Sequence, residues 1–454
     1  MNKLILSLSL CGLSLSSIQA QLTDPVEIWD SVKNNTYVVV SPEFEDILGT
    51  PYRQPLNSYG WEDGLQISAD GLNLYTLYAP ADLLSWFTYI ASNPGLPVCE
   101  TIGSTQFIRP YAETYGMDMA FNYFGCDTIM NLDILYAHRD NINDEFENWV
   151  LSDMARPGQI EGGPFPLQSA DNPNEVDHFL FTGPGDISMI NNTNANPENI
   201  ASAVLLPEPI NSAAGEFIVD NPVLRRINNS DTLLLVYEKY VDASLRDFMY
   251  AFSYDDGETW ETPVTMTSIN NATGHIEHPQ LHTDGSGTYL YYSRNFDIDR
   301  MKQSIPNNWD SWTNEQLLIS KGNALAIGEP SIAINGDIAF VLAYHNIEHP
   351  EDEFDIDPWY VRNINGPNAI HQENSLPEIV VFPNPANASI QIGNLLSSTI
   401  SVSIINMFGQ EVAYVENYQT NATISVAHLP NGIYNVVLIK PTCEKQSVQI
   451  SVLN

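Results

Sequence analysis

The sequence is poor in positive charge. It has 17 lysine and arginine residues against 56 aspartate and glutamate residues, which gives a formal net charge of -39. Phosphate backbones and anionic lipid surfaces need clustered positive charge, so this composition excludes nucleic acid as a partner. Beyond the first fifteen residues, no segment approaches the run of about eighteen apolar residues that a membrane-spanning helix requires. We therefore expect no transmembrane segment.

Cysteine is scarce as well. Cys11 lies near the N-terminus, and only Cys99, Cys126 and Cys443 follow it. No cysteine and histidine spacing matches a structural zinc site, and neither a Gly-x-Ser-x-Gly turn nor a glycine-rich phosphate loop is present. In an oxidising compartment Cys99 and Cys126 could form a disulfide that leaves Cys443 free. Nothing here indicates zinc, nucleotide or nucleophilic serine chemistry.

The N-terminus has the pattern of a cleaved signal peptide. Lys3 precedes an apolar stretch over residues 4–15, and Ala20 ends a short segment of the kind that precedes a cleavage site. We therefore predict a signal peptide over residues 1–20 and a mature protein that is exported.

Proline and aromatic residues are abundant, and prolines recur at a regular interval. The chain has 29 prolines, 26 glycines and 22 tyrosines, which is typical of an all-β protein rich in turns. An apolar strand follows about ten residues after each repeat proline, and a further copy begins near Leu65. A unit of about fifty residues with four short strands is typical of a propeller blade. The sequence predicts a six-bladed β-propeller over residues 25–370, with residues 37–41 closing the last blade; five or seven blades are alternatives. The repeat prolines are Pro110, Pro166, Pro222, Pro279 and Pro330.

One turn carries a sharper signature. Ser253, Asp255, Gly257 and Trp260 fit the pattern Ser-x-Asp-x-Gly-x-x-Trp, which resembles the Asp-box (BNR repeat) of sialidase-like propellers. The aspartate and glycine suit a tight turn and the tryptophan packs beneath it, so we expect a structural role. The Asp-Gly pairs at Asp70 and Asp284 resemble those of Tol-type six-bladed propellers.

Acidic residues precede most of the repeat prolines. In a propeller the innermost strands start around one central funnel, so these residues should converge there. Such a ring could bind a cation or a saccharide, or supply an acid and base pair for glycoside hydrolysis. The alternative is that they are solvated residues at strand ends. The catalytic candidates are Glu329, Glu277, Asp220 and Arg109, and the ligand-binding candidates are Glu62, Asp63, Glu161 and His278.

Three further groups of residues give weaker indications of a functional site. A sialidase would need three arginines around one carboxylate, and Arg225 and Arg226 are adjacent and should point to opposite faces of a strand. His275, His278 and His282 would be spread along one strand rather than share a metal. The acidic run at 352–357 could hold a calcium ion, or could be a solvated loop.

The last part of the chain consists of short alternating strands separated by turn residues, which predicts a small antiparallel β-sandwich over residues 379–454 after a linker at 371–378. Three motifs in order resemble the C-terminal sorting domain of type IX secretion cargo in Bacteroidota. The resemblance implies passage through the periplasm to the cell surface or the medium, with the type IX machinery as partner. Its motif residues are Pro383, Asn384, Pro385, Gly409, Gly432 and Tyr434.

Three functions follow as hypotheses. The first is an exported binding or interaction module for a carbohydrate or protein ligand. The second is an extracellular glycoside hydrolase, sialidase-like in fold, that acts through the funnel carboxylates. The third is a structural component of the cell surface, which would associate with itself and bind no ligand.

Overall fold

The computed structural model describes most of the chain, in two compact units, Met1–Ile370 and His371–Asn454. None of its helices is long and apolar enough to cross a membrane, among the residues described. The predicted signal peptide, the linker at 371–378, Gly409 and the cysteines lie outside those residues. The described residues are 25–93, 107–119, 132–155, 161–169, 175–183, 186–191, 203–212, 218–227, 230–241, 245–270, 274–347, 353–365, 380–393, 400–406, 410–419, 422–439 and 445–453.

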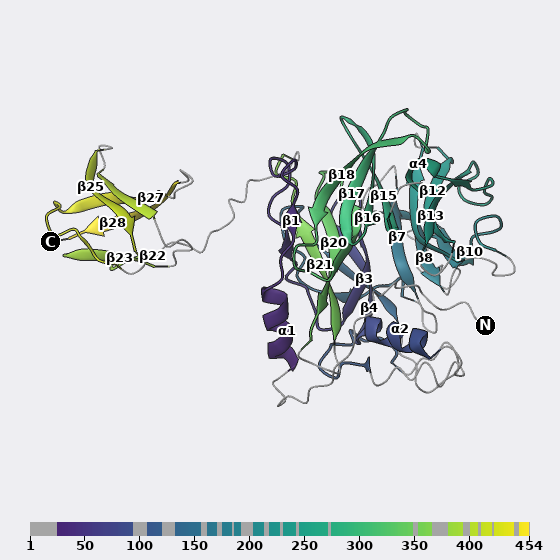
Figure 1. The fold of residues 1–454 in the computed structure, drawn as a ribbon, viewed down its shortest axis with the longest axis horizontal. Coiled ribbons are helices and arrows are strands. Elements are labelled where there is room, and N and C mark those ends of the chain that lie inside the picture. Colours follow the sequence, from purple (N-terminus) through teal and green to yellow (C-terminus); the bar gives the residue numbers. More distant parts are fainter. Residues whose placement is uncertain are drawn as a thin grey trace. The chain divides into compact units, whose positions relative to one another are not determined.

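The first unit is built from five antiparallel sheets (Figure 1). Their innermost strands, β3, β7, β11, β15 and β19, contact one another in cyclic order, β19 returning to β3. Sheets arranged in this way around one axis form a β-propeller, which confirms the predicted fold class. The blades are, in order, β3 (Trp61–Ile67), β4 (Asn73–Ala79), β5 (Asp133–His138) and β6 (Val150–Leu151); β7 (Gly162–Gln168), β8 (Val176–Gly183), β9 (Asp186–Asn191) and β10 (Val204–Leu205); β11 (Val219–Arg226), β12 (Leu233–Tyr240), β13 (Arg246–Ser253) and β14 (Val264–Thr265); β15 (Ile276–Asp284), β16 (Gly287–Arg294), β17 (Asp297–Gln303) and β18 (Trp312–Ser320); and β19 (Ala326–Ile332), β20 (Ile338–His345) and β21 (Phe354–Val361).

The described residues form five blades, so the predicted number of six is corrected to the five-blade alternative. The unit predicted at Pro110 is not a blade, because β5 pairs with β4 and completes the first sheet. Residues 80–132, with helix α2 (Leu83–Ser92), are therefore an insertion within the first blade. The insertion is about as long as one blade, which is why Pro110 fell on the proline interval.

The N-terminal segment adds outer strands to two blades. Helix α1 (Pro25–Asn34) comes first, and β1 (Val39–Val40) then pairs with β18 as the fifth strand of the fourth blade. The short strand β2 (Tyr52–Arg53) pairs with β21 and completes the last blade. Strand β2 therefore closes the last blade. It lies about a dozen residues beyond the segment at 37–41 that was predicted to do so.

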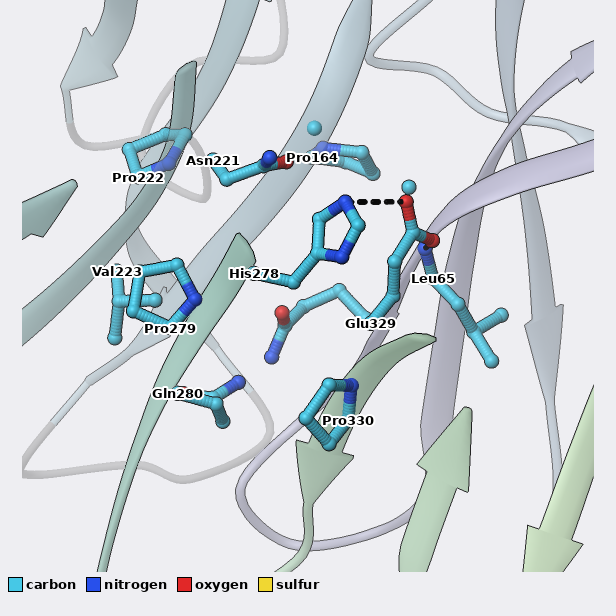
Figure 2. Close-up of a pocket in the computed structure, with 13 residues that line it drawn as sticks. Leu65, Pro164, Asn221, Pro222, Val223, His278, Pro279, Gln280, Glu329 and Pro330 are labelled. Atoms are coloured by element: carbon cyan, nitrogen blue, oxygen red, sulfur yellow. Dashed lines mark hydrogen bonds and ion pairs between the residues drawn. The ribbon is translucent and has the colours of Figure 1, made fainter. Parts of the chain in front are cut away.

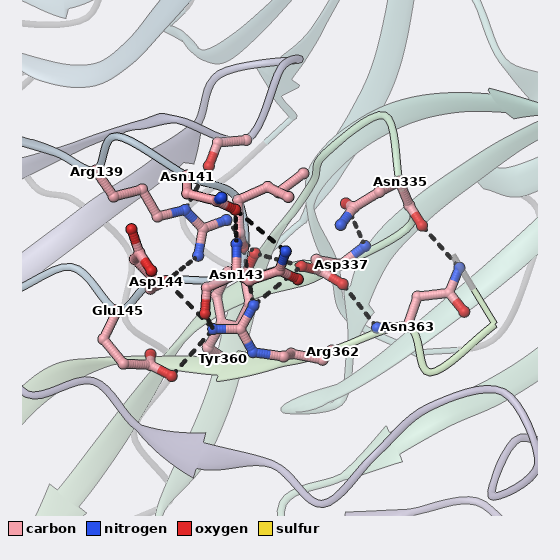
Figure 3. A network of polar contacts seen from close by, with 12 residues as sticks. Arg139, Asn141, Asn143, Asp144, Glu145, Asn335, Asp337, Tyr360, Arg362 and Asn363 are labelled. Carbon is pink, nitrogen blue, oxygen red and sulfur yellow. Dashed lines mark hydrogen bonds and ion pairs between the residues drawn. The ribbon is translucent and has the colours of Figure 1, made fainter. Parts of the chain in front are cut away.

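A polar network joins the first and last blades (Figure 3). Arg139 of the first blade donates to the Tyr360 hydroxyl at 2.8 Å, and Tyr360 in turn donates to Asp337 at 2.8 Å. From the last blade, Arg362 donates to the carbonyl of Ile142 at 2.9 Å. These bonds hold the first and last blades together where the chain does not connect them directly.

The middle strands are buried on both faces, because each sheet is covered by a neighbour on either side. Every residue of β21 is buried, and β20 is buried except at its last residue. This arrangement explains why the sequence shows continuous apolar runs such as Leu233–Tyr237 instead of strict alternation. A short helix, α4 (Thr267–Asn270), contacts β13 and β18.

The residues of the predicted Asp-box form the turn between β13 and β14. The Asp255 carboxylate accepts from the Ser253 hydroxyl and from the Thr259 backbone N–H, both at 2.8 Å. Gly257 has a φ of 93°, in the left-handed region, and Trp260 is buried. Asp255 is therefore engaged in the turn, as a structural role requires.

The second unit is a small antiparallel sandwich with its own apolar core. One sheet has the order β22-β23-β26 and the other β25-β24-β27-β28. Tyr434 of the third predicted motif is buried in this core, and its hydroxyl donates to the Pro430 carbonyl at 2.8 Å. The strands are β22 (Val380–Phe382), β23 (Ser389–Gly393), β24 (Ile400–Asn406), β25 (Glu411–Tyr418), β26 (Ile424–Ser425), β27 (Gly432–Ile439) and β28 (Lys445–Val452).

Candidate functional site

All five innermost strands carry a β-bulge at the same place. Each bulge shifts the register with the second strand of its blade, and a residue with positive φ lies within it. A proline follows this residue in four blades, and in the second blade that proline is Pro164, two residues before the predicted Pro166. The residues with positive φ are Gly64 (62°), Gly163 (49°), Asn221 (49°), His278 (58°) and Glu329 (55°).

Three of these positions hold side chains where glycine would be unstrained. A left-handed backbone is uncommon for residues other than glycine, although asparagine and histidine tolerate it better than glutamate. Bulges are frequent beside functional sites, where they redirect a side chain. Here Asn221, His278 and Glu329 line a central hollow of about 330 Å³, its open mouth included (Figure 2). The strained positions therefore mark a candidate site on the propeller axis.

Glu329 is the central acidic group of this hollow. One carboxyl oxygen accepts from the Leu65 N–H at 2.8 Å, and the other lies 3.5 Å from His278 Nε2. Burial, followed by the nearby Asp63 carboxylate, raises the pKa of Glu329 well above its ordinary value. Glu329 therefore holds a proton more tightly than a solvated glutamate does, which suits a proton donor.

Asp220 lies at the start of β11 and also influences Glu329 electrostatically. Its carboxylate accepts from the Asn221 N–H at 2.9 Å and from the Tyr240 hydroxyl at 3.3 Å. Burial raises the pKa of Asp220, while hydrogen bonds from Asn221 and Thr182 and the charges of His278 and Arg246 oppose that rise. A carboxylate with a raised pKa that still accepts hydrogen bonds suits a general base.

Behind these groups, Arg246 lies between two glutamates. Its guanidinium is 3.5 Å from Glu277 and 3.7 Å from Glu238, and it stacks on the Tyr240 ring with 3.5 Å to the centroid. Burial and the carboxylates of Glu277 and Asp220 raise the pKa of Glu238 to about 8. For Glu277 burial is outweighed by His275, 2.7 Å away, and by the charges of His278 and Arg246, so its pKa is lowered. Neighbouring carboxyls thus hold opposite protonation states at pH 7.

The structure separates the predicted site residues into two sets. Asp220, Glu277, His278 and Glu329 come together around the hollow, and Asp63 adjoins it through Gly64. The other set is buried away from the hollow lining. Glu62 and Glu161 have no exposed surface, and Arg109 pairs with Asp355 at 2.7 Å.

Among the described residues, the arginines do not lie together around one site for a substrate carboxylate, which is the arrangement that a sialidase needs. Arg225 lies over the Trp309 ring, 5.8 Å from its centroid, and Arg226 pairs with Asp256 at 2.8 Å. Arg294 forms an ion pair with Glu315. In the described part of the chain no group of three histidine, cysteine, aspartate or glutamate residues is arranged to hold a metal ion. Asp355 and Asp357 of the acidic run pair with Lys33 at 2.7 and 2.8 Å.

Three residues near the hollow were not predicted from the sequence, namely Glu238, Arg246 and Tyr240. Glu238 follows the apolar run Leu233–Tyr237 within β12, and Arg246 begins β13, which pairs with it. A charged residue that continues a fully apolar strand is a signal for a buried, paired charge. This signal is present in the sequence. It does not identify the residue that pairs with the charge, because that requires the register of the strands.

The fold and the tail together define an exported propeller protein. Residues 380–452 match the family described as a secretion system C-terminal sorting domain. This finding confirms the resemblance of the tail to the type IX sorting domain and implies export to the cell surface or the medium. No curated protein matches the chain.

Several solved structures resemble the chain at low identity. A GH62 hydrolase in complex with xylotriose matches over 72% of this chain and 95% of its own, with 7% identity and a TM-score of 0.39. The xyloglucan PUL GH43B of Bacteroides ovatus matches over 88% and 92%, with 10% identity and a TM-score of 0.38. PorZ, a surface component of the type-IX secretion system of Porphyromonas gingivalis, matches over 86% and 51%, with 11% identity and a TM-score of 0.27. Similarity at this level gives no information about the reaction.

Proposed function

We propose that the protein is an exported glycan-directed hydrolase whose site is the central hollow. The observation that carries the proposal is the raised pKa of Glu329, a carboxyl at a strained backbone position inside that hollow. Carboxyls that keep a proton at neutral pH beside carboxylates that have lost theirs are the usual means of acid and base catalysis.

The roles follow from the environments of the groups. Glu329 donates its proton to the leaving oxygen of the glycosidic bond, and His278, 3.5 Å away, orients its carboxyl. Asp220, which accepts hydrogen bonds from Asn221 and Tyr240, takes the proton of the attacking water. Glu277 and Arg246 form an ion pair beside these two catalytic groups. The rate should therefore fall at low pH, where Asp220 is protonated, and at high pH, where Glu329 loses its proton.

The substrate should be a neutral saccharide. The chain carries a net charge of -39, and the hollow is surrounded by carboxylates. The arginines described above do not converge on a site for a substrate carboxylate. Sialic acids and uronic acids would therefore be repelled, whereas uncharged sugars would not.

A test uses the full chain and a panel of neutral aryl glycosides and polysaccharides. Glu329→Gln should lower kcat by about 100-fold or more, the usual contribution of a general acid. Glu258→Gln, the same change at an exposed residue of the Asp-box turn, should leave kcat unchanged. Turnover that is equal in wild type and Glu329→Gln, or absent from wild type on every substrate, would overturn hydrolysis at this site.

A binding module is the second candidate. Asn221 and His278 present an amide and an imidazole to the hollow, and both groups hydrogen-bond sugar hydroxyls without any reaction. Saccharide binding without turnover in the same assays would favour this function. Export has a separate test, since deletion of residues 377–454 should retain the protein in the periplasm; unchanged appearance outside the cell would contradict the sorting role.

A further inference from the structure

An exposed phenylalanine occupies a backbone position made for glycine. Asn295 and Phe296 are the two residues between β16 and β17, with φ values of 51° and 71°. A two-residue hairpin turn with positive φ at both positions normally takes Asn-Gly, because a Cβ at the second position is strained. Asparagine fits the first position, and phenylalanine does not fit the second. A strained residue that persists at such a place points to a function.

The turn that carries Phe296 is bonded to the ends of two strands that line the central hollow. The Asn295 N–H donates to the His275 carbonyl at 3.0 Å, just before β15. The Phe296 carbonyl accepts from the Ile327 N–H at 3.1 Å, two residues before Glu329. The turn is thus bonded to the starts of both innermost strands that carry His278 and Glu329.

The ring is partly open to solvent, and its neighbours are polar. Its side chain is 39% exposed, the His275 ring lies 6.5 Å away, and Lys321 Nζ is 5.5 Å from its centroid. A pyranose or furanose ring has an apolar face of C–H groups that packs on an aromatic ring, while its hydroxyls reach outward to polar groups. Phe296, with Lys321 Nζ over one face of its ring and His275 beside it, offers both kinds of contact.

We propose that Phe296 is a stacking platform for a neutral sugar unit next to the one held in the hollow. This inference rests on the proposed function, because it takes the hollow as the place where a saccharide is held. The platform makes the site prefer oligosaccharides over single sugars attached to a small leaving group. His275, which also bonds Glu277 at 2.7 Å, connects the platform to the charged groups behind the hollow.

The test compares aromatic with small residues at this position. Phe296→Ala should raise KM for neutral oligosaccharides of three to six units by about tenfold, a typical loss for one aromatic contact. The same variant should keep kcat/KM on aryl monoglycosides within twofold, and Phe296→Trp should keep the affinity for oligosaccharides. Tyr254→Ala is the matched control, since Tyr254 is 60% exposed in the Asp-box turn of another blade.

A stability measurement separates recognition from a structural role. Phe296→Gly removes the strained Cβ, so the melting temperature should stay the same or rise by about 2 °C while oligosaccharide affinity falls. A melting temperature lower by more than about 5 °C, with unchanged affinity, would show that the ring serves folding and would overturn the platform.

The outcomes also distinguish this inference from the proposed function. Oligosaccharides that bind without being cleaved, with affinity lost in Phe296→Ala, would keep the platform and overturn the hydrolase. Cleavage with equal KM in wild type and Phe296→Ala would keep the hydrolase and overturn the platform. No binding and no cleavage of any saccharide in the panel by the wild-type chain would overturn both.

Discussion

The propeller contains two groups of buried carboxylates that differ in how their charge is balanced. In the first, Asp355 and Asp357 of β21 are paired with Lys33 from α1 and with Arg109 from the insertion in the first blade. In the second, at the hollow, the charges of His278 and Arg246 act on Asp220, and His278 also lies 3.5 Å from Glu329, so these carboxyls share cations instead of each having its own. The first group, which we call the closed group, has no exposed surface, whereas Glu329 of the second group lines an open hollow.

The difference shows how one chain uses the same residue types for structure and for chemistry. A buried ion pair fixes the elements that supply its members, here α1 and the insertion. Carboxyls without such partners keep a proton at pH values where a carboxyl in water would have lost it. Catalysis needs the second situation, because a carboxylate that is fully buried in an ion pair has no surface open to a substrate.

The largest effect should follow from removing the cation of the closed group. Lys33→Met leaves Asp355 and Asp357 buried without their shared ammonium, so we expect a loss of about 3–5 kcal/mol in the free energy of unfolding. Urea unfolding followed by tryptophan fluorescence reports this specifically, because all 8 tryptophans lie in the first unit. Lys302→Met, which removes a lysine outside this group, is the control. A loss below about 1 kcal/mol for Lys33→Met would mean that the closed group does not hold α1 in place.

Most of the acidic residues in this comparison could be predicted from the sequence. Which of them lie at the hollow and which are buried elsewhere could not be predicted. The proline interval and the residues before each proline predicted a propeller and placed Asp220, Glu277, His278 and Glu329 in one register. The same register includes Glu62 and Glu161, which are fully buried. Whether a residue at a strand start faces the axis or the neighbouring blade depends on the bulge, and a bulge shifts the register without changing the local pattern.

Contacts between residues that are far apart in the sequence could not be predicted either. Lys33 reaches Asp355 and Asp357 across more than three hundred residues, and nothing in the local sequence marks that contact. The blade count failed for a related reason, since an insertion of one blade's length preserved the interval at Pro110. The sorting tail was recognised because its motifs are local and ordered, and local signals are what a single sequence retains.

The second effect is a fall in stability as the pH rises. The pKa values of Asp133 and Asp357 are raised to about 6, that of Asp299 to about 7 and that of Glu238 to about 8, in each case chiefly by burial. A carboxyl whose pKa is higher in the folded state holds a proton that the unfolded chain has released, so its contribution is present at low pH and is lost as the pH rises from about 4 to 8. Glu277, with a lowered pKa, works in the opposite direction. We expect a melting temperature at pH 8.5 that is lower by about 5 °C than at pH 5.5. A melting temperature that rises over this range would contradict the protonated state of these groups.

The smallest expected effect on stability concerns Glu62, a single residue that lies beside the closed group. Burial, followed by the Asp357 carboxylate, raises the pKa of Glu62 well above its ordinary value and so favours its neutral form. One of its oxygens accepts from the Ser58 N–H at 3.1 Å, and a glutamine oxygen would accept the same bond. Glu62→Gln should therefore change the free energy of unfolding by less than about 1 kcal/mol at pH 7.

The matched control is Asp355→Asn, which makes the same chemical change at a charged neighbour. Asp355 accepts a hydrogen bond from Arg109 at 2.7 Å and forms an ion pair with Lys33 at 2.7 Å, so its neutral replacement should cost about 3 kcal/mol or more. Urea unfolding at pH 7 gives both values, and repeating it at pH 9 should show that Glu62→Gln loses less stability than wild type, because the variant has no proton to release there. Equal losses for the two variants at pH 7 would show that Glu62 is ionised and that the closed group carries more negative charge than its geometry indicates.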